Sequence, residues 1–248
     1  MRQKLNRFKD NKQNPYILEP EMKHFEAIQQ EWSQIFDMNK PIILEVGAGK
    51  GDYTIALAKK HPERNFVGID VKGDRLWHAA TTARDEKLGN VRLLRVQADH
   101  LAQLFPKSSV SEIWITFPGP RPKKREAKKR LTHTRFLTIY GEILKDNGII
   151  HLKTDNAKLY FDTYQLLKDD KHATILEHTA DLYQSAITGA PIDTQTHFEK
   201  KYLAQGMPIH YLKFHYHRNL AMKRSGSVLG RIFAKMIDTI TYPLTGRG

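Results

Sequence analysis

Short apolar runs of strand length alternate along most of the chain with longer stretches whose apolar residues recur at helical spacing. The runs are IILEV, NFVGIDV, VRLLRV, EIWITF and GIIHLK, beginning at residues 42, 65, 91, 112 and 148. The predicted helices lie between them, at 52–60, 74–88, 99–105 and 132–145. Strands that alternate with helices of this length are typical of βαβ units. The sequence therefore predicts an α/β fold with a central, mostly parallel sheet and helices on both faces.

Apolar spacing extends this pattern beyond the five runs. Between Glu21 and Asp37 the large apolar residues recur at helical spacing and predict an amphipathic helix. Beyond Asn156 we expect another helix, then a loop around residues 181–195 and a short helix that ends at Gly206. The segment IHYLKFHYH, residues 209–217, alternates roughly between apolar and polar positions and predicts a late antiparallel strand.

The composition divides the chain into three parts. Residues 1–20 are basic with few apolar positions, so we expect a flexible basic arm that orders on binding. Residues 21–217 are expected to form a single domain, since α/β domains of this size commonly fold as one unit. Residues 218–248 form a C-terminal extension, in which apolar positions from Val228 to Ile240 mark one face of an amphipathic helix. Core packing or self-association, and attachment to a membrane surface, both stay open for that face.

The net charge narrows the class of partner. Lysine and arginine total 40 against 27 acidic residues, a formal net charge of +13, which indicates a polyanion, with nucleic acid as the first candidate. A generally basic, solvated surface is the alternative. The chain has no cysteine and no apolar stretch long enough to span a bilayer, so we expect a cytoplasmic protein without disulfides or membrane spans. The histidines show no metal-binding spacing, so we expect no bound metal.

A glycine-rich turn stands directly after the first of the five predicted strands. Gly47, Gly49 and Gly51 separate this strand from a predicted helix, where the backbone must turn sharply and approach a ligand closely. In the dinucleotide pattern G-x-G-x-x-G the third glycine would fall on Asp52. A carboxylate there would repel a pyrophosphate at the helix N-terminus, which disfavours NAD.

The acidic residues around this turn suggest a different ligand. Glu45 precedes the glycines, and Asp70 ends the second strand, where a carboxylate can accept both ribose hydroxyl hydrogens. The pattern resembles the first two motifs of the Rossmann-like class I methyltransferases, which use S-adenosylmethionine. The resemblance implies that Glu45 lies near the cationic methionine portion, that Asp70 holds the ribose, and that Gln97 and Ala98 border the adenine. Closer relatives often have Asp at the position of Gln97.

A basic run follows the fourth strand, in TFPGPRPKKREAKKRLTHTRFL. Its cations are Arg121, Lys123, Lys124, Arg125, Lys128, Lys129 and Arg130, with Glu126 as the single acid among them. In a parallel α/β sheet ligands bind beyond the carboxyl ends of the strands, so the run should border the glycine-rich turn. A solvated run of charge is the alternative, but self-repulsion favours a polyanion that neutralises it. The sequence thus predicts a phosphate-binding surface beside the methyl donor.

Three separated motifs resemble the bacterial tRNA (guanine-N7)-methyltransferases, over residues 40–217. The family signature F-P-D-P-W-x-K-x-R-H-x-K-R-R-L is matched by Phe117, Pro118, Pro120, Lys123, Arg125, Lys128, Lys129, Arg130 and Leu131. The family's T-D pair stands here as Thr154 and Asp155, and its T-x-F-E as Thr196, Phe198 and Glu199. The chain departs from the signature at three positions, where Gly119 replaces Asp, Arg121 replaces Trp and Glu126 replaces His. The Asp that Gly119 replaces is the position usually treated as catalytic, and it also borders the cofactor.

The resemblance implies an enzyme that transfers a methyl group from S-adenosylmethionine to N7 of a guanosine in the tRNA variable loop. Lys123, Arg125, Lys129 and Arg130 would bind RNA, and Thr196 and Phe198 would shape the pocket. Since N7 carries a lone pair and no proton, transfer needs alignment more than a general base. Asp155 and Glu199 would stabilise charge that moves to the purine and would select guanine.

Alternative interpretations stay open for the residues and for the chain. Asp155 also suits a turn or a helix cap, and Glu199 suits a helix surface. Because Gly119 lacks the family's carboxylate, the chain could be a catalytically degraded relative that binds tRNA without modifying it. A third possibility is an S-adenosylmethionine-dependent enzyme that acts on another RNA. Family members differ in oligomeric state, so a monomer and a homodimer are both compatible with the sequence.

Overall fold

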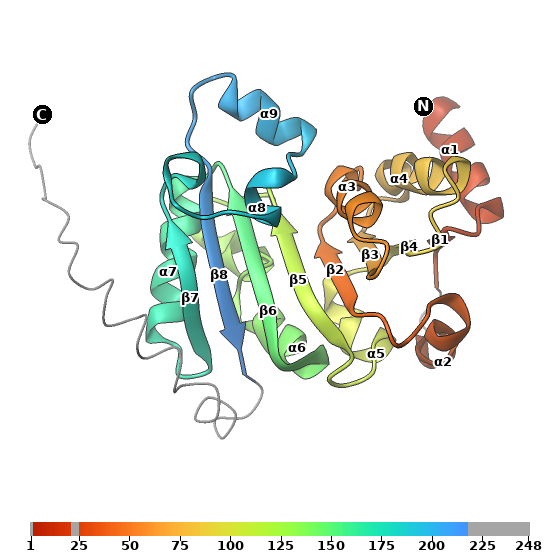
Figure 1. The fold of residues 1–248 in the computed structure, drawn as a ribbon, viewed down its shortest axis with the longest axis horizontal. Helices are drawn as coiled ribbons and strands as arrows, with labels where there is room; N and C mark the ends of the chain where they lie inside the picture. Colours follow the sequence, from red (N-terminus) through yellow and green to blue (C-terminus); the bar gives the residue numbers. More distant parts are fainter. Residues whose placement is uncertain (1, 21–24, 218–248) are drawn as a thin grey trace, which may run out of the picture.

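One mixed sheet organises the chain in the computed structural model, which describes residues 2–20 and 25–217 (Figure 1). Its strand order is β1-β4-β3-β2-β5-β6-β8-β7. The strands are β1 (Ile17–Leu18), β2 (Ile42–Val46), β3 (Asn65–Asp70), β4 (Val91–Arg95), β5 (Val110–Thr116), β6 (Leu144–Thr154), β7 (Ala173–Thr179) and β8 (His210–Tyr216). The helices are α1 (Arg2–Gln13), α2 (Phe25–Ile35), α3 (Asp52–Lys60), α4 (Gly73–Asp85), α5 (Leu101–Leu104), α6 (Thr134–Ile143), α7 (Ala157–Asp169), α8 (Ala190–Asp193) and α9 (His197–Leu203). Three 3-10 turns complete the set: η2 (Ala98–His100), η3 (Lys124–Lys129) and η4 (Leu182–Gln184).

The predicted fold is confirmed. Strands β1 to β6 pair in parallel, while β8 is antiparallel to both β6 and β7. The five predicted strands correspond to β2 to β6, and the predicted late strand is β8. The pattern of apolar residues did not predict β7. This strand lies at the sheet edge and is half-buried along most of its length, so its residues show little contrast between a core face and a solvent face.

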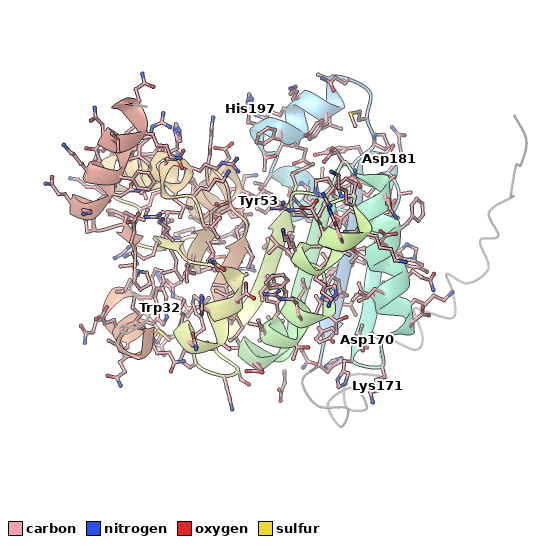
Figure 2. All side chains as sticks on the ribbon, turned by 180° about the vertical axis from the view of Figure 1, so that it is seen from behind. Trp32, Tyr53, Asp170, Lys171, Asp181 and His197 are labelled. Carbon is pink, nitrogen blue, oxygen red and sulfur yellow. The ribbon has the colours of Figure 1, made fainter. Side chains whose placement is uncertain are left out.

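Alternation along β2 separates the two hydrophobic layers. Leu44 belongs to the cluster that contains Trp32 of α2, whereas Ile43 belongs to the cluster that contains Tyr53 of α3. Trp32 is fully buried, and its indole N–H donates to the Leu104 carbonyl oxygen at 2.7 Å. Both labelled side chains, Trp32 and Tyr53, are visible in Figure 2. Because successive side chains of a strand point to opposite faces, Glu45 shares the α3 face with Ile43.

The order of the strands reverses beside β2. The chain runs outward from β2 to β3 and β4, then returns to place β5 on the other side of β2. Such a reversal leaves a crevice at the carboxyl ends of the two neighbouring strands, which is where ligands bind in open α/β sheets. In Figure 1 the arrows of β2 and β5 end at the side of the molecule that carries α3, α8 and α9.

The N-terminal segment differs from the predicted flexible arm. Residues 2–13 form α1 and residues 17–18 pair with β4 as β1, so this segment is part of the same sheet and its covering layer. The side-chain amide of Asn11 donates to the Gly73 carbonyl oxygen at 2.9 Å, and the Arg7 guanidinium lies 5.0 Å from the centre of the Trp77 ring. These partners are more than 60 residues away along the chain, so local composition could not reveal them.

The predicted C-terminal extension, with its apolar positions from Val228 to Ile240, lies outside the described residues. The domain boundary at residue 217 therefore stays a prediction. Within residues 2–20 and 25–217, no helix is long and apolar enough to cross a membrane.

Replacing Asn11 with Ala tests whether α1 is docked on α4. Asn11 is buried, so the Gly73 carbonyl oxygen would lose its donor inside the packed contact between the helices. We expect the free energy of unfolding to fall by about 1–3 kcal/mol, measured by urea denaturation. Lys12→Ala is the control, because Lys12 is exposed on the same helix. Equal stability of the two variants would show that α1 does not rest on α4.

Candidate active site

The glycine-rich turn joins β2 to α3 at the reversal of strand order. Gly47, Gly49 and Gly51 all have positive φ, at 82°, 60° and 74°. Two of them are also required by packing, because a Cβ on Gly47 would lie 2.9 Å from Leu131 Cδ1, and one on Gly51 would lie 2.5 Å from Ala79 Cβ. A Cβ on Gly49 would meet nothing within 4 Å. The middle of the turn thus faces open space, which fits a ligand that passes close to the backbone.

Glu45 lies beneath this turn and is buried. Its Oε2 accepts hydrogen bonds from the backbone N–H of Thr54 at 2.9 Å and from the Thr54 hydroxyl at 2.5 Å, and its Oε1 accepts from the Thr116 hydroxyl at 2.5 Å. Burial raises the pKa of Glu45 to about 7, although the hydrogen bonds from Thr116 and Thr54 oppose the shift. The residue therefore ties β2 to α3 and β5 and can gain or lose a proton near neutral pH.

Asp70 lies at the end of β3 and is half-buried. One carboxylate oxygen accepts the backbone N–H of Gly49 at 3.0 Å, and the other accepts that of Lys72 at 2.8 Å. Each oxygen keeps a second lone pair, so two hydroxyl hydrogens of a ribose could still be accepted. The side chain of Val71, 53% exposed, adds an apolar surface beside this carboxylate. The sequence analysis missed Val71, which looks like an ordinary strand residue.

The residues predicted to border the adenine lie just past β4. Gln97 is exposed and Ala98 is buried at the start of η2. The last residue of β4, Arg95, pairs in register with Asp70 of β3. Gln97 therefore follows the strand next to the ribose carboxylate, at the same edge of the sheet.

The basic loop lies against the glycine-rich turn. Leu131, at the end of the loop, occupies the space above Gly47, so the two segments are in direct contact. Lys123 and Arg125 are exposed, as are the other lysines of the loop. Arg130 differs, because its side chain is only 11% exposed and its Nη1 lies 2.6 Å from Asp162 Oδ2 on α7. Of the four cations predicted to bind RNA, Arg130 instead holds the loop to the domain.

Asp155 stands free at the end of β6. The helix that follows is capped by its neighbour Asn156, whose side-chain oxygen accepts the backbone N–H of Leu159 at 2.8 Å. Asp155 is half-buried, and in the part of the chain that the structure describes its carboxylate has no side-chain hydrogen bond or ion pair. Desolvation, followed by the charge of Asp155, raises the pKa of Tyr202. The alternative of a capping role belongs to Asn156, which leaves Asp155 accessible to a substrate.

Glu199 is fully buried and pairs with an equally buried lysine, Lys153 of β6. The Lys153 Nζ lies 2.7 Å from Glu199 Oε1 and donates to its Oε2 at 2.9 Å. The Tyr183 hydroxyl donates to the same carboxylate at 2.9 Å. Glu199 therefore has no exposed atom to offer a substrate and is not the surface residue of a helix. Burial lowers the pKa of Lys153, and the charge of Glu199 opposes that shift.

The same lysine fastens the segment before α9. Lys153 also donates to the carbonyl oxygens of Pro191 at 2.5 Å and Thr194 at 3.2 Å, while the Tyr53 hydroxyl donates to the Ala190 carbonyl oxygen at 3.1 Å. Tyr53 and His197 of α9 lie at the same end of the molecule (Figure 2). The sequence analysis missed Lys153, because nothing local distinguishes it from a surface lysine.

Thr196 and Phe198, the other two residues of the T-x-F-E motif, lie in different surroundings from Glu199. Thr196 is buried and forms a capping box with Glu199, in which each side chain accepts the backbone N–H of the other residue. Phe198 is 51% exposed on α9, which is unusual for a large apolar ring. Thr196 thus starts the helix, and Phe198 is the member of the motif that can contact a partner.

An open hollow of about 540 Å³ lies between α3 and α4, next to the glycine-rich turn. It is lined by Lys50, Asp52, Ile55, Ala56, Lys59, His78, Ala79, Thr82 and His197. None of these residues belongs to the predicted site. The described residues contain no cluster of histidine, cysteine, aspartate and glutamate that could hold a metal ion.

The buried ion pair can be tested by removing either charge. Lys153→Met and Glu199→Gln should each lower the free energy of unfolding by about 3–5 kcal/mol, because each leaves a buried charge without its partner. The double variant should lose less than the sum of the two. Lys158→Met is the control, since this exposed lysine pairs with Asp162 on the surface and should cost less than about 1 kcal/mol. Additive losses in urea denaturation would show that the two charges do not interact.

Comparison with known proteins identifies the family. A family model described as "Putative methyltransferase" matches residues 39–212. The tRNA (guanine-N(7)-)-methyltransferase of Christiangramia forsetii is 41% identical over 217 residues, which cover 85% of this chain and 96% of that protein. The corresponding protein of Cytophaga hutchinsonii is 39% identical over 216 residues, 87% of this chain and 98% of that protein.

A solved structure supports the fold. The 30S ribosomal A1408 methyltransferase from an uncultured bacterium aligns with a TM-score of 0.53 at 18% identity, over 76% of this chain and 93% of that chain. The family predicted from the three sequence motifs is confirmed. The chain belongs to the methyltransferase family that includes these tRNA (guanine-N(7)-)-methyltransferases.

Proposed function

We propose that the protein transfers a methyl group from S-adenosylmethionine to N7 of a guanosine in tRNA. The observation that carries the proposal is the contact between Leu131 and Gly47, because it joins an RNA-binding loop to a donor-binding turn. The names of the 41% and 39% identical relatives support the choice of tRNA and of guanine N7. The family resemblance further supports the variable loop as the location of the guanosine, and tRNA as a substrate implies action in the cytoplasm.

The residues at the carboxyl ends of β2, β3 and β4 fit the donor. Asp70 has lone pairs for the two ribose hydroxyls, and the exposed Val71 supplies apolar surface for a purine. Glu45 supplies negative charge beneath the turn, close to where the cationic methionine portion would lie. When bound, the donor supplies an electrophilic methyl group on a positively charged sulfur.

The chain's own residues must then align the base. The N7 atom has a lone pair and carries no proton, so no residue needs to act as a general base, and positioning is the main requirement. Positive charge moves to the purine as the methyl group transfers, and a nearby carboxylate stabilises it. Asp155 is suited to this role because its carboxylate is accessible and unpaired. Glu199 acts at a distance, by fixing the segment that precedes α9.

The RNA-binding surface follows from the exposed groups of the loop. Lys123, Arg125 and Lys129 offer cations for phosphates, and the exposed Phe198 ring offers a face on which a base can stack. Arg130 contributes by fixing the loop to α7 through Asp162. The loop thus presents its free charge beside the donor turn.

Product identification tests the proposal. Purified protein given S-adenosylmethionine and unmodified tRNA should form 7-methylguanosine, detected by mass spectrometry of the digested nucleosides. Asp70→Asn is the control, because it removes a charged acceptor that the ribose needs and should reduce product at limiting donor. Sequencing of the modified site should place it in the variable loop. Absence of 7-methylguanosine with every cognate tRNA would refute the activity, and a product at another site would refute only the position.

The raised pKa of Glu45 predicts a pH dependence of donor binding. A cationic donor favours the carboxylate, and this group loses its proton only as the pH passes about 7. The affinity for S-adenosylmethionine, measured by calorimetry, should therefore rise roughly tenfold from pH 6 to pH 8. Glu45→Gln should bind more weakly and remove this rise. If donor affinity in Glu45→Gln depended on pH as it does in the wild-type protein, Glu45 would not be the group that couples donor binding to pH.

The raised pKa of Glu45 makes the stability of the unliganded protein change with pH in the direction opposite to donor affinity. Between about pH 4.5 and about pH 7 the folded state keeps the proton of Glu45 while the unfolded state has lost it. The contribution of this group to stability is present at low pH and is lost as the pH rises through that window.

A further inference from the structure

The three departures from the family signature lie in one contact cluster. A Cβ placed on Gly119 would have one neighbour within 4 Å, the Nε atom of Arg121 at 3.9 Å. The Nη1 atom of the same arginine lies 3.7 Å from Glu126 Oε1. The chain thus combines a missing carboxylate, a new guanidinium and a new acid at adjoining positions. The three substituted positions therefore lie together in one loop.

The fold holds Arg121 in place. Its φ of 46° is in the left-handed region, which is costly for a residue with a side chain and is typically maintained where function requires it. The Arg121 carbonyl oxygen accepts hydrogen bonds from Nε and Nη2 of Arg130, both at 3.2 Å. Arg130 is anchored in turn to Asp162 of α7. The backbone of Arg121 is therefore fixed to the domain, while its side chain is 51% exposed.

The charge of this cluster suits an oxyanion. Glu126 is shared between Arg121 and Lys129, at 3.7 and 3.8 Å, so one acid faces two cations. Both distances are long for an ion pair, which leaves donors of the guanidinium for another acceptor. A guanidinium matches the oxygens of a phosphate in a forked geometry that lysine cannot provide. Gly119 has no side chain that could compete for the nearby Nε of Arg121.

We propose that Arg121, oriented by Glu126, binds a backbone phosphate next to the target nucleotide and so positions the base at the donor turn. This inference rests on the proposed function for its substrate. It assigns Gly119 a role as well, because a carboxylate at this position would pair with Arg121 and withdraw it from the RNA. The three departures are then an alternative way to position the substrate, in place of the family's acidic residue.

The test compares substitutions in the full-length protein. Arg121→Gln keeps an unbranched side chain at the left-handed position and removes the charge. It should raise both the Kd and the KM for unmodified tRNA about tenfold, with S-adenosylhomocysteine affinity changed less than twofold. Lys128→Gln, an exposed cation of the same loop, should have a smaller effect. Lys145→Gln, at the opposite end of the sheet, should have none.

Substitution of Gly119 distinguishes phosphate binding by Arg121 from a degraded active site. Gly119→Asp should raise the KM for tRNA without raising kcat, whereas Gly119→Asn, of similar size and without charge, should change KM less. A higher kcat in Gly119→Asp would overturn the inference and indicate a degraded active site instead. So would an Arg121→Gln effect no larger than that of Lys128→Gln, or one confined to donor affinity. The tRNA Kd needs no turnover, so the inference is tested even if the wild-type protein forms no 7-methylguanosine.

Discussion

The buried carboxylate of Glu45 is the interaction on which the site depends. It links the two strands at the reversal of the sheet, since it belongs to β2 and accepts a hydrogen bond from Thr116 of β5. It also accepts two hydrogen bonds from Thr54 and thereby fixes the first turn of α3. The glycine-rich turn and the basic loop begin immediately beyond these bonds. Their contact through Gly47 and Leu131 is a consequence of strands held in this way.

A second buried charge, that of Lys153, fixes the segment that precedes α9. Lys153 of β6 reaches Glu199 and two carbonyl oxygens of the segment that precedes α9, so a single side chain fixes several turns of irregular backbone. Breaking a buried ion pair is costly because the remaining charge is neither paired nor solvated by water. The pair therefore fixes the segment before α9, and Asp155, just past the end of the same strand, is the carboxylate that we propose contacts the base.

Much of this could be predicted from the sequence because the signals are local. The apolar runs identified β2 to β6 and β8, and the spacing of Glu45, Gly47 and Asp70 predicted the turn that we propose binds the donor. Signals that depend on distant partners were missed. Residues 1–20 looked like a flexible arm because the groups that hold Asn11 and Arg7 lie on α4. Likewise, Arg130 and Glu199 resemble their neighbours in the sequence, and only the fold shows that each is held by a buried or half-buried partner.

Donor and RNA should meet at one edge of the sheet, between the glycine-rich turn and the basic loop. Amide hydrogen exchange by mass spectrometry can locate both ligands, with S-adenosylhomocysteine and unmodified tRNA added separately and together. We expect slower exchange in residues 47–52 with S-adenosylhomocysteine and in residues 121–130 with tRNA, and protection of both in the ternary mixture. Protection by tRNA at the opposite end of the strands, in residues 144–148, with none in 121–130 would contradict it.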